Sequence, residues 1–270
     1  MHVILYLLAL ITALTSCSGE VRPKECIALA ELSDTIPGDF ATFSPKPVVV
    51  APYPWQDVSG SNLRPITIEH FRCKGSSLNP ARIVMEGSKE VDHIYDCSGS
   101  ERHSLPLQDG KEYIYPVLLE LVNEIQRATK CPVIITSGHR CPSHGAYIDS
   151  SPKASGSKHL IGAEVDFYVQ GLESCPEKAL QIVFDHYKKD PTYANQKEYS
   201  TFLRWEKQKD TATAPWYNKE VFIKLYKKHE GRNFDNRHPY AYISIQVRFD
   251  REKNERIAVS YQRANQLLRK

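Results

Sequence analysis

The sequence has almost no net charge, and this limits the partners that composition can suggest. Its 270 residues include 35 Lys and Arg against 32 Asp and Glu, which gives a formal net charge of +3 at pH 7. Proteins that bind nucleic acid through its phosphates usually carry a larger basic excess, clustered on one face. The composition therefore gives no support for a nucleic-acid partner.

Internal repeats, low-complexity tracts and long apolar runs are absent after the N-terminus. The apolar stretch in residues 1–17 is short for a membrane span and is typical of a secretory signal. Residues 14–17, Leu-Thr-Ser-Cys, resemble the bacterial lipobox, in which the cysteine is acylated; an ordinary cleaved signal with an incidental cysteine is the alternative. We expect residues 1–17 to be a lipoprotein signal, Cys17 to be lipidated, and residues 18–50 to form an irregular tether. The mature protein would then be exported and anchored to a membrane by lipid, facing the periplasm or cell wall.

No two cysteines have the C-x-x-C spacing of many structural zinc sites, which makes disulfides the favoured prediction. Without Cys17, an even number remains, as expected for an oxidising compartment, at positions 26, 73, 97, 131, 141 and 175. The sequence does not choose among the fifteen pairings that are possible for six cysteines. We favour Cys73 with Cys97 and Cys141 with Cys175. Only Cys131 with Cys141 is excluded, because an extended segment between them would hold their α-carbons beyond about 7 Å.

The pattern of apolar residues changes near residue 110. Before it, short alternating segments predict a small β-rich unit over residues 51–109, with strands at 66–72, 81–85 and 91–95. After it, helices and strands alternate. Helices are predicted at 116–129, from Pro176 onward and at 220–230, and strands at 133–136 and 240–249. The segment 199–209 is predicted to be a helix or a loop. This mixed order predicts an α+β domain over residues 110–270, with a mostly antiparallel sheet flanked by helices.

A histidine and an aspartate are spaced so that one metal ion could reach both. The residues Val165, Phe167 and Val169 alternate with Glu164, Asp166 and Tyr168, so Asp166 projects from one face of a strand. His159 precedes Gly162, a residue that lets the chain turn back. Zinc binds imidazole nitrogen and carboxylate oxygen, so the two side chains are candidate ligands. A hydrogen-bonded or surface pair is the alternative, and this spacing alone does not decide between them.

The segment 121–141, with its Ser-Gly-His-Arg turn at 137–140, followed by Ser157-Lys-His-Leu-Ile-Gly-Ala-Glu-Val-Asp166, resembles the zinc D-alanyl-D-alanine peptidase family. That family has an S-G-Y-R-like turn and then S-x-H-x-x-G-x-A-x-D, and the resemblance covers roughly residues 110 to 250. It implies a fold shared with the hedgehog signalling domain, one zinc ion, and cleavage of D-amino-acid bonds in peptidoglycan stem peptides. It also implies that His159 and Asp166 bind the zinc. Arg140 would pair with the carboxylate of the substrate, and Ser157 would hydrogen-bond substrate groups nearby. A buried salt bridge that orders the loop is the alternative for Arg140.

The chain departs from this family in its last strand, which normally carries a third zinc histidine and a general base in a pattern like F-V-H-I-D-V-R. Here the segment 242–248 reads Tyr-Ile-Ser-Ile-Gln-Val-Arg, with Ser244 in the place of the histidine and Gln246 in the place of the aspartate. His238 would lie about 20 Å from the position of Ser244 along an extended strand, unless Pro239 folds it back. Glu164 replaces a small alanine and is a candidate base or ligand, with a salt-bridged surface glutamate as the alternative.

Two functions follow from these residues. The first is an exported zinc peptidase that uses His159, Asp166 and an unidentified third ligand, with Glu164 in a catalytic role. The second is an inactive member of the same family that serves as a lipid-anchored peptidoglycan-binding or scaffold protein. The retained histidine and aspartate favour the first, and Ser244 with Gln246 favours the second.

Overall fold

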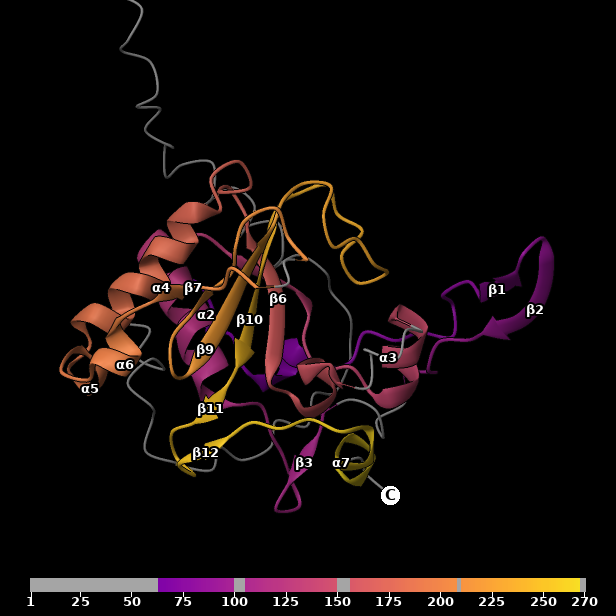
Figure 1. Ribbon diagram of the computed structural model, residues 1–270, viewed down its shortest axis with the longest axis horizontal. Helices are drawn as coiled ribbons and strands as arrows, with labels where there is room; N and C mark the ends of the chain where they lie inside the picture. Colours follow the sequence, from indigo (N-terminus) through magenta and orange to yellow (C-terminus); the bar gives the residue numbers. More distant parts are fainter. Residues whose placement is uncertain (1–62, 100–104, 150–155, 208–209, 268–270) are drawn as a thin grey trace, which may run out of the picture. The chain divides into compact units, whose positions relative to one another are not determined.

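A computed structural model describes residues 63–99, 105–149, 156–207 and 210–267 (Figure 1). The predicted lipoprotein signal over 1–17, with Cys17, and the predicted tether over 18–50 lie outside these residues. Among the helices in the described ranges, none is long and apolar enough to cross a membrane.

A six-stranded antiparallel sheet forms the centre of the fold, with the strand order β5-β6-β10-β9-β8-β7. The strands are β5 (Val133–Ser137), β6 (Glu164–Val169), β7 (Leu203–Arg204), β8 (Trp216–Tyr217), β9 (Val221–Tyr226) and β10 (Tyr242–Val247). Three two-stranded ribbons lie outside it: β1 (Arg82–Glu86) with β2 (Lys89–Ile94), β3 (Leu107–Gln108) with β4 (Lys111–Glu112), and β11 (Phe249–Asp250) with β12 (Glu255–Arg256). The predicted α+β class with a mostly antiparallel sheet is confirmed at this level.

Helix α2 (Pro116–Thr129) packs against the central strands and supplies much of the core. Proline at its first position needs no backbone N–H partner, and Lys130 ends the helix in the left-handed conformation. Its fully buried side chains recur at helical spacing: Leu118, Leu121, Val122 and Ile125. Helix α4 (Glu177–Lys189) packs beside α2, and both helices lie along the sheet in Figure 1. The shorter helices are α3 (Pro142–Ile148), α5 (Pro191–Ala194), α6 (Lys197–Ser200) and α7 (Tyr261–Gln266), with 3₁₀ turns η3 (Ile68–Phe71) and η6 (Lys158–Ile161).

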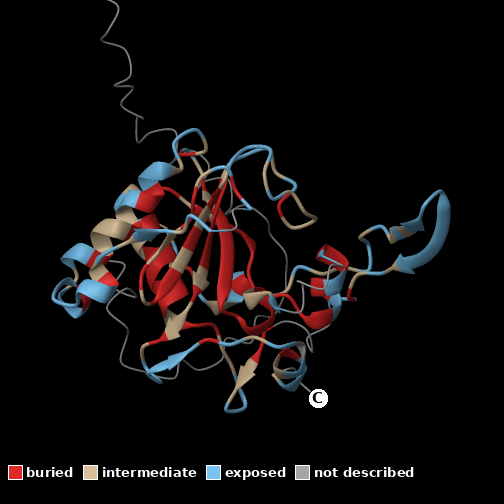
Figure 2. Cartoon of the chain, in the orientation of Figure 1, coloured by how far each residue is buried: buried red, intermediate tan, exposed pale blue. Residues whose placement is uncertain are grey.

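The described part of the predicted β-rich unit is only partly a β structure. Strands β1 and β2 form the expected hairpin, which is largely exposed (Figure 2). The strand predicted over 66–72 is wrong, because this segment forms the 3₁₀ turn η3, which Thr67 and His70 cap reciprocally. Phe71 is fully buried, and its carbonyl accepts a hydrogen bond of 2.7 Å from the backbone N–H of His139. These residues belong to the same compact unit as residues 110–270.

The helix predicted over 220–230 is also wrong, because residues 221–226 form strand β9. Buried Val221, Ile223 and Leu225 alternate with half-buried residues at 222, 224 and 226, which is the period of a strand and not of a helix. Gly231 does not end a helix; it lies in the following loop at φ +58°, where an added Cβ would fall 2.3 Å from the hydroxyl of Tyr242. The run from Lys224 to Lys228, which in the sequence resembles the exposed face of a helix, therefore begins inside the sheet.

Candidate metal centre

The polar side chains of β6, β10 and β9 share one face of the sheet. Asp166 lies directly opposite Ser244, which in turn lies opposite Lys224, and Glu164 lies opposite Gln246. Residues that face each other across antiparallel strands point to the same side. The apolar residues that alternate with them form the other face, which packs against α2. The two faces of these strands therefore separate the core from a polar site.

Three potential metal ligands meet on the polar face: His159, Glu164 and Asp166. All three are buried, and one ligand atom from each lies within 4.8 Å of the others. His159 comes from the turn η6, which Gly162 ends in the left-handed conformation at φ +69°, so that the chain reverses into β6. The structure therefore places the predicted histidine and aspartate side by side, and adds Glu164 to them.

The distances within this group are those of ligands around an ion rather than of hydrogen-bonded partners. The Nε2 atom of His159 lies 3.6 Å from Oε1 of Glu164 and 3.5 Å from Oδ2 of Asp166. Hydrogen bonds between such atoms normally span about 2.7–3.2 Å. Two atoms that each bind one zinc ion at about 2.1 Å, at a tetrahedral angle, lie about 3.4 Å apart. The three side chains are thus spaced so that one metal ion could lie between them, and the same contacts are long ion pairs between the imidazole and the two carboxylates.

The imidazole of His159 is oriented by a contact on its other side. Its Nδ1 atom lies 2.6 Å from the backbone carbonyl oxygen of Gly138, so Nδ1 carries the hydrogen and donates it. In the neutral ring the lone pair then resides on Nε2, which faces the two carboxylates. A backbone partner of this kind is common for histidines that bind metals, since it fixes both the tautomer and the ring orientation.

Asp166 is held in its charged form by polar neighbours. The side-chain amide of Asn236 donates to its Oδ2 atom at 2.9 Å, and the guanidinium of Arg140 lies 3.5 Å away. Burial alone would raise the pKa of Asp166, but the nearby His159 and Arg140 outweigh this effect and the pKa is lowered. The carboxylate is therefore available to a cation.

Glu164 is held by Ser244 and Gln246, two polar residues of β10. The hydroxyl of Ser244 donates to Oε1 of Glu164 at 3.0 Å, and the amide of Gln246 donates to the same oxygen at 2.7 Å. These two hydrogen bonds fix the position of the Glu164 carboxylate on β6 beside β10.

Arg140 forms part of a buried ion-pair network behind the three donors. Its Nε atom donates to Oδ2 of Asp235 and to the hydroxyl of Ser137, both at 2.9 Å. Asp235 also lies 2.9 Å from Nε2 of His144, and its pKa is held well below the usual range, since these contacts outweigh the effect of burial. The guanidinium therefore stabilises the loop that carries Asp235, and its predicted contact with substrate stays a prediction.

A pocket of about 470 Å³ opens over the donors. Ser157 and Arg140, the two predicted substrate-binding residues, both line it, and so do three further cationic side chains: Lys158, Lys224 and Arg232. Burial lowers the pKa of Lys158 to about 8, although the nearby Glu164 opposes this effect. A concave site with several cationic side chains favours an anionic ligand.

His238, the other histidine considered as a third ligand, lies outside the donor group. Its ring packs 4.9 Å from that of Tyr168, between centroids, and both of its nitrogens lack a hydrogen-bond partner within the described residues. Tyr168 lies two positions along β6 from Asp166, so Pro239 does return His238 toward the sheet. In this structure Glu164, and not His238, completes the group of three.

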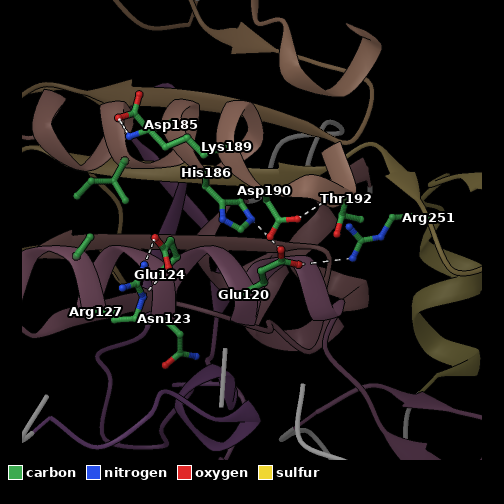
Figure 3. Close-up of a pocket in the computed structure, with 12 residues that line it drawn as sticks. Glu120, Asn123, Glu124, Arg127, Asp185, His186, Lys189, Asp190, Thr192 and Arg251 are labelled. Atoms are coloured by element: carbon green, nitrogen blue, oxygen red, sulfur yellow. Dashed lines mark hydrogen bonds and ion pairs between the residues drawn. The ribbon is translucent and has the colours of Figure 1, made fainter. Parts of the chain in front are cut away.

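A second cavity, of about 810 Å³, lies beside α2 and α4 (Figure 3). Glu120, His186 and Asp190 also form a group within 4.8 Å. Here, however, Oε1 of Glu120 is hydrogen-bonded to Nε2 of His186 at 2.8 Å and Oε2 lies 3.6 Å from Arg251, so these groups already satisfy one another. The neighbouring Glu220, which accepts a hydrogen bond from Tyr187, has its pKa raised to about 7 by burial, against the opposing effects of Arg251 and Tyr187. This network joins the two helices to the sheet and is structural.

The cysteines of the described ranges form no disulfide. The sulfur atoms of Cys73 and Cys97, the first favoured pair, are 3.9 Å apart and not bonded. Cys141 lies against these two, whereas Cys175, its favoured partner, is exposed and is not part of the group. Cys26 lies outside the described residues.

The chain has no match in comparisons with protein-family models, with curated proteins or with solved structures.

Proposed function

We propose that this protein is an exported, zinc-dependent peptidase-like protein that acts on D-amino-acid bonds of peptidoglycan stem peptides, with the metal held by His159, Glu164 and Asp166. The main support is the spacing of 3.5 and 3.6 Å between Nε2 of His159 and the two carboxylate oxygens, too long for hydrogen bonds and suited to a shared ion. The resemblance of residues 137–166 to the D-alanyl-D-alanine peptidases supplies the reaction and the substrate class. The hedgehog-like form of the α+β fold and the lipid anchor at Cys17 belong to the same proposal.

The donor set suits zinc by its chemistry as well as its geometry. Imidazole nitrogen and carboxylate oxygen are both zinc ligands, and three protein ligands are the number found in catalytic zinc sites, in which a fourth position stays open to water or substrate. When bound, the ion would supply Lewis acidity to a water molecule and to the scissile carbonyl. The two carboxylates also balance the charge of a divalent ion.

The remaining residues of the pocket would bind and orient the peptide. The cationic side chains Lys158, Lys224 and Arg232 surround the donors, and a stem peptide that ends in D-alanine carries a terminal carboxylate. Arg140 adds a planar guanidinium to the pocket wall, a group that matches a carboxylate in shape. Ser157, at the start of η6, would hydrogen-bond nearby peptide groups.

The alternative function is an inactive peptide-binding or scaffold protein. The observation that favours it is that Gln246 occupies the position of the family's general base and donates its amide to Glu164. An amide does not accept a proton from water at neutral pH. If Glu164 serves as a ligand, no carboxylate among the described residues of the pocket replaces the base, since Asp166 is a ligand and Asp149 is the only other acid that lines it.

The two functions are separated by one set of measurements on the purified protein. Zinc content is measured first, and then release of D-alanine from a peptide that ends in D-Ala-D-Ala, by mass spectrometry. For the peptidase we expect turnover and zinc at this site. His159→Ala should lose turnover and one zinc equivalent, and His93→Ala, a matched change of an exposed histidine in the β1–β2 hairpin, should keep both. Zinc-dependent binding of the peptide without turnover would establish the scaffold. If His159→Ala kept the zinc content of the unchanged protein, the metal site at His159 and the zinc-dependent peptidase would be rejected.

A further inference from the structure

A second group of soft donors lies close to the loop that supports the metal centre. Cys73 follows the turn η3, Cys97 follows strand β2, and Cys141 caps the N-terminus of α3. Although they come from three separate segments, their sulfur atoms all lie within 4.8 Å of one another. Cys97 and Cys141 are buried, and Cys73 is half-buried.

His144 and Asp96 extend this group on one side. One ligand atom each from Asp96, Cys97 and His144 also lie within 4.8 Å of one another, so Cys97 belongs to both sets. His144 stands three residues after Cys141, which puts both on the first turn of α3. A Cβ added at Gly75 would fall 2.0 Å from Sγ of Cys97 and 3.1 Å from Nδ1 of His144. The glycine therefore leaves open the space beside the sulfur and the imidazole.

We propose that Cys73, Cys97 and Cys141 hold a structural zinc ion, separate from the centre at His159, and that His144, which lies in ligand range of Cys97, completes a Cys₃His set. Three cysteines and one histidine are a standard tetrahedral donor set for structural zinc. A disulfide would use only two of the three sulfurs and would leave the third thiol against it. The C-x-x-H spacing of Cys141 and His144 does what C-x-x-C does in other sites, and a search for cysteine pairs alone does not find it.

The histidine of this site has its orientation set by a carboxylate. Its Nε2 atom lies 2.9 Å from Oδ1 of Asp235, which would hold the ring so that Nδ1 faces the sulfurs. Nδ1 contacts Oδ1 of Asp96 at 2.6 Å, so both ring nitrogens face carboxylates and both carry a hydrogen, of which Nδ1 would have to release its own to bind a metal. On binding, Nδ1 would exchange this contact for the metal, and Asp96 would keep its hydrogen bonds from Ser76 and Asn79.

Burial and their mutual contacts favour the neutral thiols of Cys73 and Cys141. Contacts with Cys141 and Cys97, together with burial, raise the pKa of Cys73. The contact with Cys73 lowers the pKa of Cys141, but Cys97 and burial outweigh it and raise the value to about 12. A divalent ion supplies the missing charge, so each cysteine would release a proton when the metal binds.

This site would fasten the N-terminal segment to the metal centre. It would join the ends of the η3 segment and of the hairpin to α3. From there a chain of ion pairs leads to the metal centre: His144 contacts Asp235, Asp235 contacts Arg140, and Arg140 contacts Asp166. The hairpin itself has few other anchors, because β1 and β2 are mostly exposed. The metal would therefore position residues without touching substrate.

Zinc analysis of the full chain, purified with reduced thiols, tests the proposal. We expect two zinc equivalents in the unchanged protein and one in Cys97→Ser, with Cys175→Ser, a change of an exposed cysteine, as the matched control that keeps both. His159→Ala should lose the other equivalent, so the two sites are counted separately. A failure of the peptidase proposal would leave the zinc that depends on Cys97 in place.

A spectrum of the unchanged protein loaded with cobalt tests the cysteine site without a substitution that could prevent folding. Cobalt bound by several thiolates gives strong sulfur-to-metal charge-transfer absorption and the visible bands of a tetrahedral site, which His159→Ala should retain. Absence of these bands in the reduced protein would overturn the proposal. So would a disulfide between any two of Cys73, Cys97 and Cys141 in the protein as isolated from its own compartment, detected by mass spectrometry of unreduced peptides.

Discussion

Replacement of Glu164 by glutamine tests whether this carboxylate is a metal ligand or a catalytic base. The change keeps the size of the side chain, and its amide oxygen can still accept the hydrogen bonds from Ser244 and Gln246, which meet on one oxygen of the wild-type residue. It removes the negative charge beside Nε2 of His159. We expect Glu164→Gln to fold normally and to bind zinc much more weakly.

The size of the effect follows from the small number of donors. A structural zinc site with four ligands contributes about 10–16 kcal/mol, or about 3 kcal/mol per ligand if they share it evenly. Loss of one of three donors should then weaken zinc binding by roughly a hundredfold or more. Ser244→Ala removes only a hydrogen bond to a ligand, so we expect a loss of roughly tenfold.

The assay is competition for zinc with a coloured chelator, combined with turnover of a D-Ala-D-Ala peptide at saturating zinc. To count only the site at His159, each variant is compared with His159→Ala under the same conditions. If Glu164→Gln kept the zinc affinity of the unchanged protein and lost turnover, Glu164 would be a base and not a ligand. The geometric reasoning from the 3.6 Å separation would then be refuted for this residue.

Three further changes test the surroundings of the site. Arg140→Ala leaves the buried carboxylates of Asp166 and Asp235 without their partner, so urea unfolding should show a loss of about 3–5 kcal/mol; a change near zero would leave substrate binding as the role of the arginine. Gly162→Ala puts a side chain at φ +69°, and we expect a loss of about 1–2 kcal/mol by thermal unfolding, with unchanged stability as the contrary result. Burial raises the pKa of Glu220 from 4.5 to about 7, so between these pH values the folded state holds a proton that the unfolded state releases. The free energy of unfolding therefore includes up to about 3 kcal/mol from this proton below pH 4.5, and this contribution is lost as the pH rises to about 7. Urea unfolding at several pH values should show this slope, and its persistence in Glu220→Gln would assign it to another group.

The elements with a strong periodic signal were predictable from the sequence. Helix α2 begins and ends where its proline and its apolar spacing indicate, and β10 lies within the predicted strand 240–249. Strand β9 was not predictable, because Lys224 and the lysines that follow it suggested an exposed helical surface. In the sheet, Lys224 lies on the polar face at the pocket, where a charged residue on a strand is tolerated. A short segment with mixed charge does not reveal which face is buried.

The local part of the candidate site was predictable, and the distant part was not. His159 and Asp166 lie within one short segment, so a turn and a strand are enough to bring them together. Asn236 holds Asp166 from a loop 70 residues further along the chain, Asp235 of the same loop holds Arg140, and neither stands in a recognisable pattern. Only the return of the chain after β9 puts that loop beside β6. A contact of this kind depends on the whole fold.

The replacements that argued against activity in the sequence have a different meaning in the structure. Read along the chain, Ser244 and Gln246 look like the loss of a ligand and of a base. Across the strands, they are the two donors that hold Glu164, and Glu164 is the residue that replaces a small alanine. Under the proposed function, Glu164 on β6 takes the role of a metal ligand that the resembled family carries on β10, and Ser244 and Gln246 position it. The triple variant Glu164→Ala, Ser244→His, Gln246→Asp should then bind more zinc than Glu164→Ala does, as measured by metal analysis. Ser244→His alone, which puts an imidazole in place of a hydroxyl 3.0 Å from Glu164, should not gain zinc. Equal zinc content in the triple variant and Glu164→Ala would contradict this exchange of ligands.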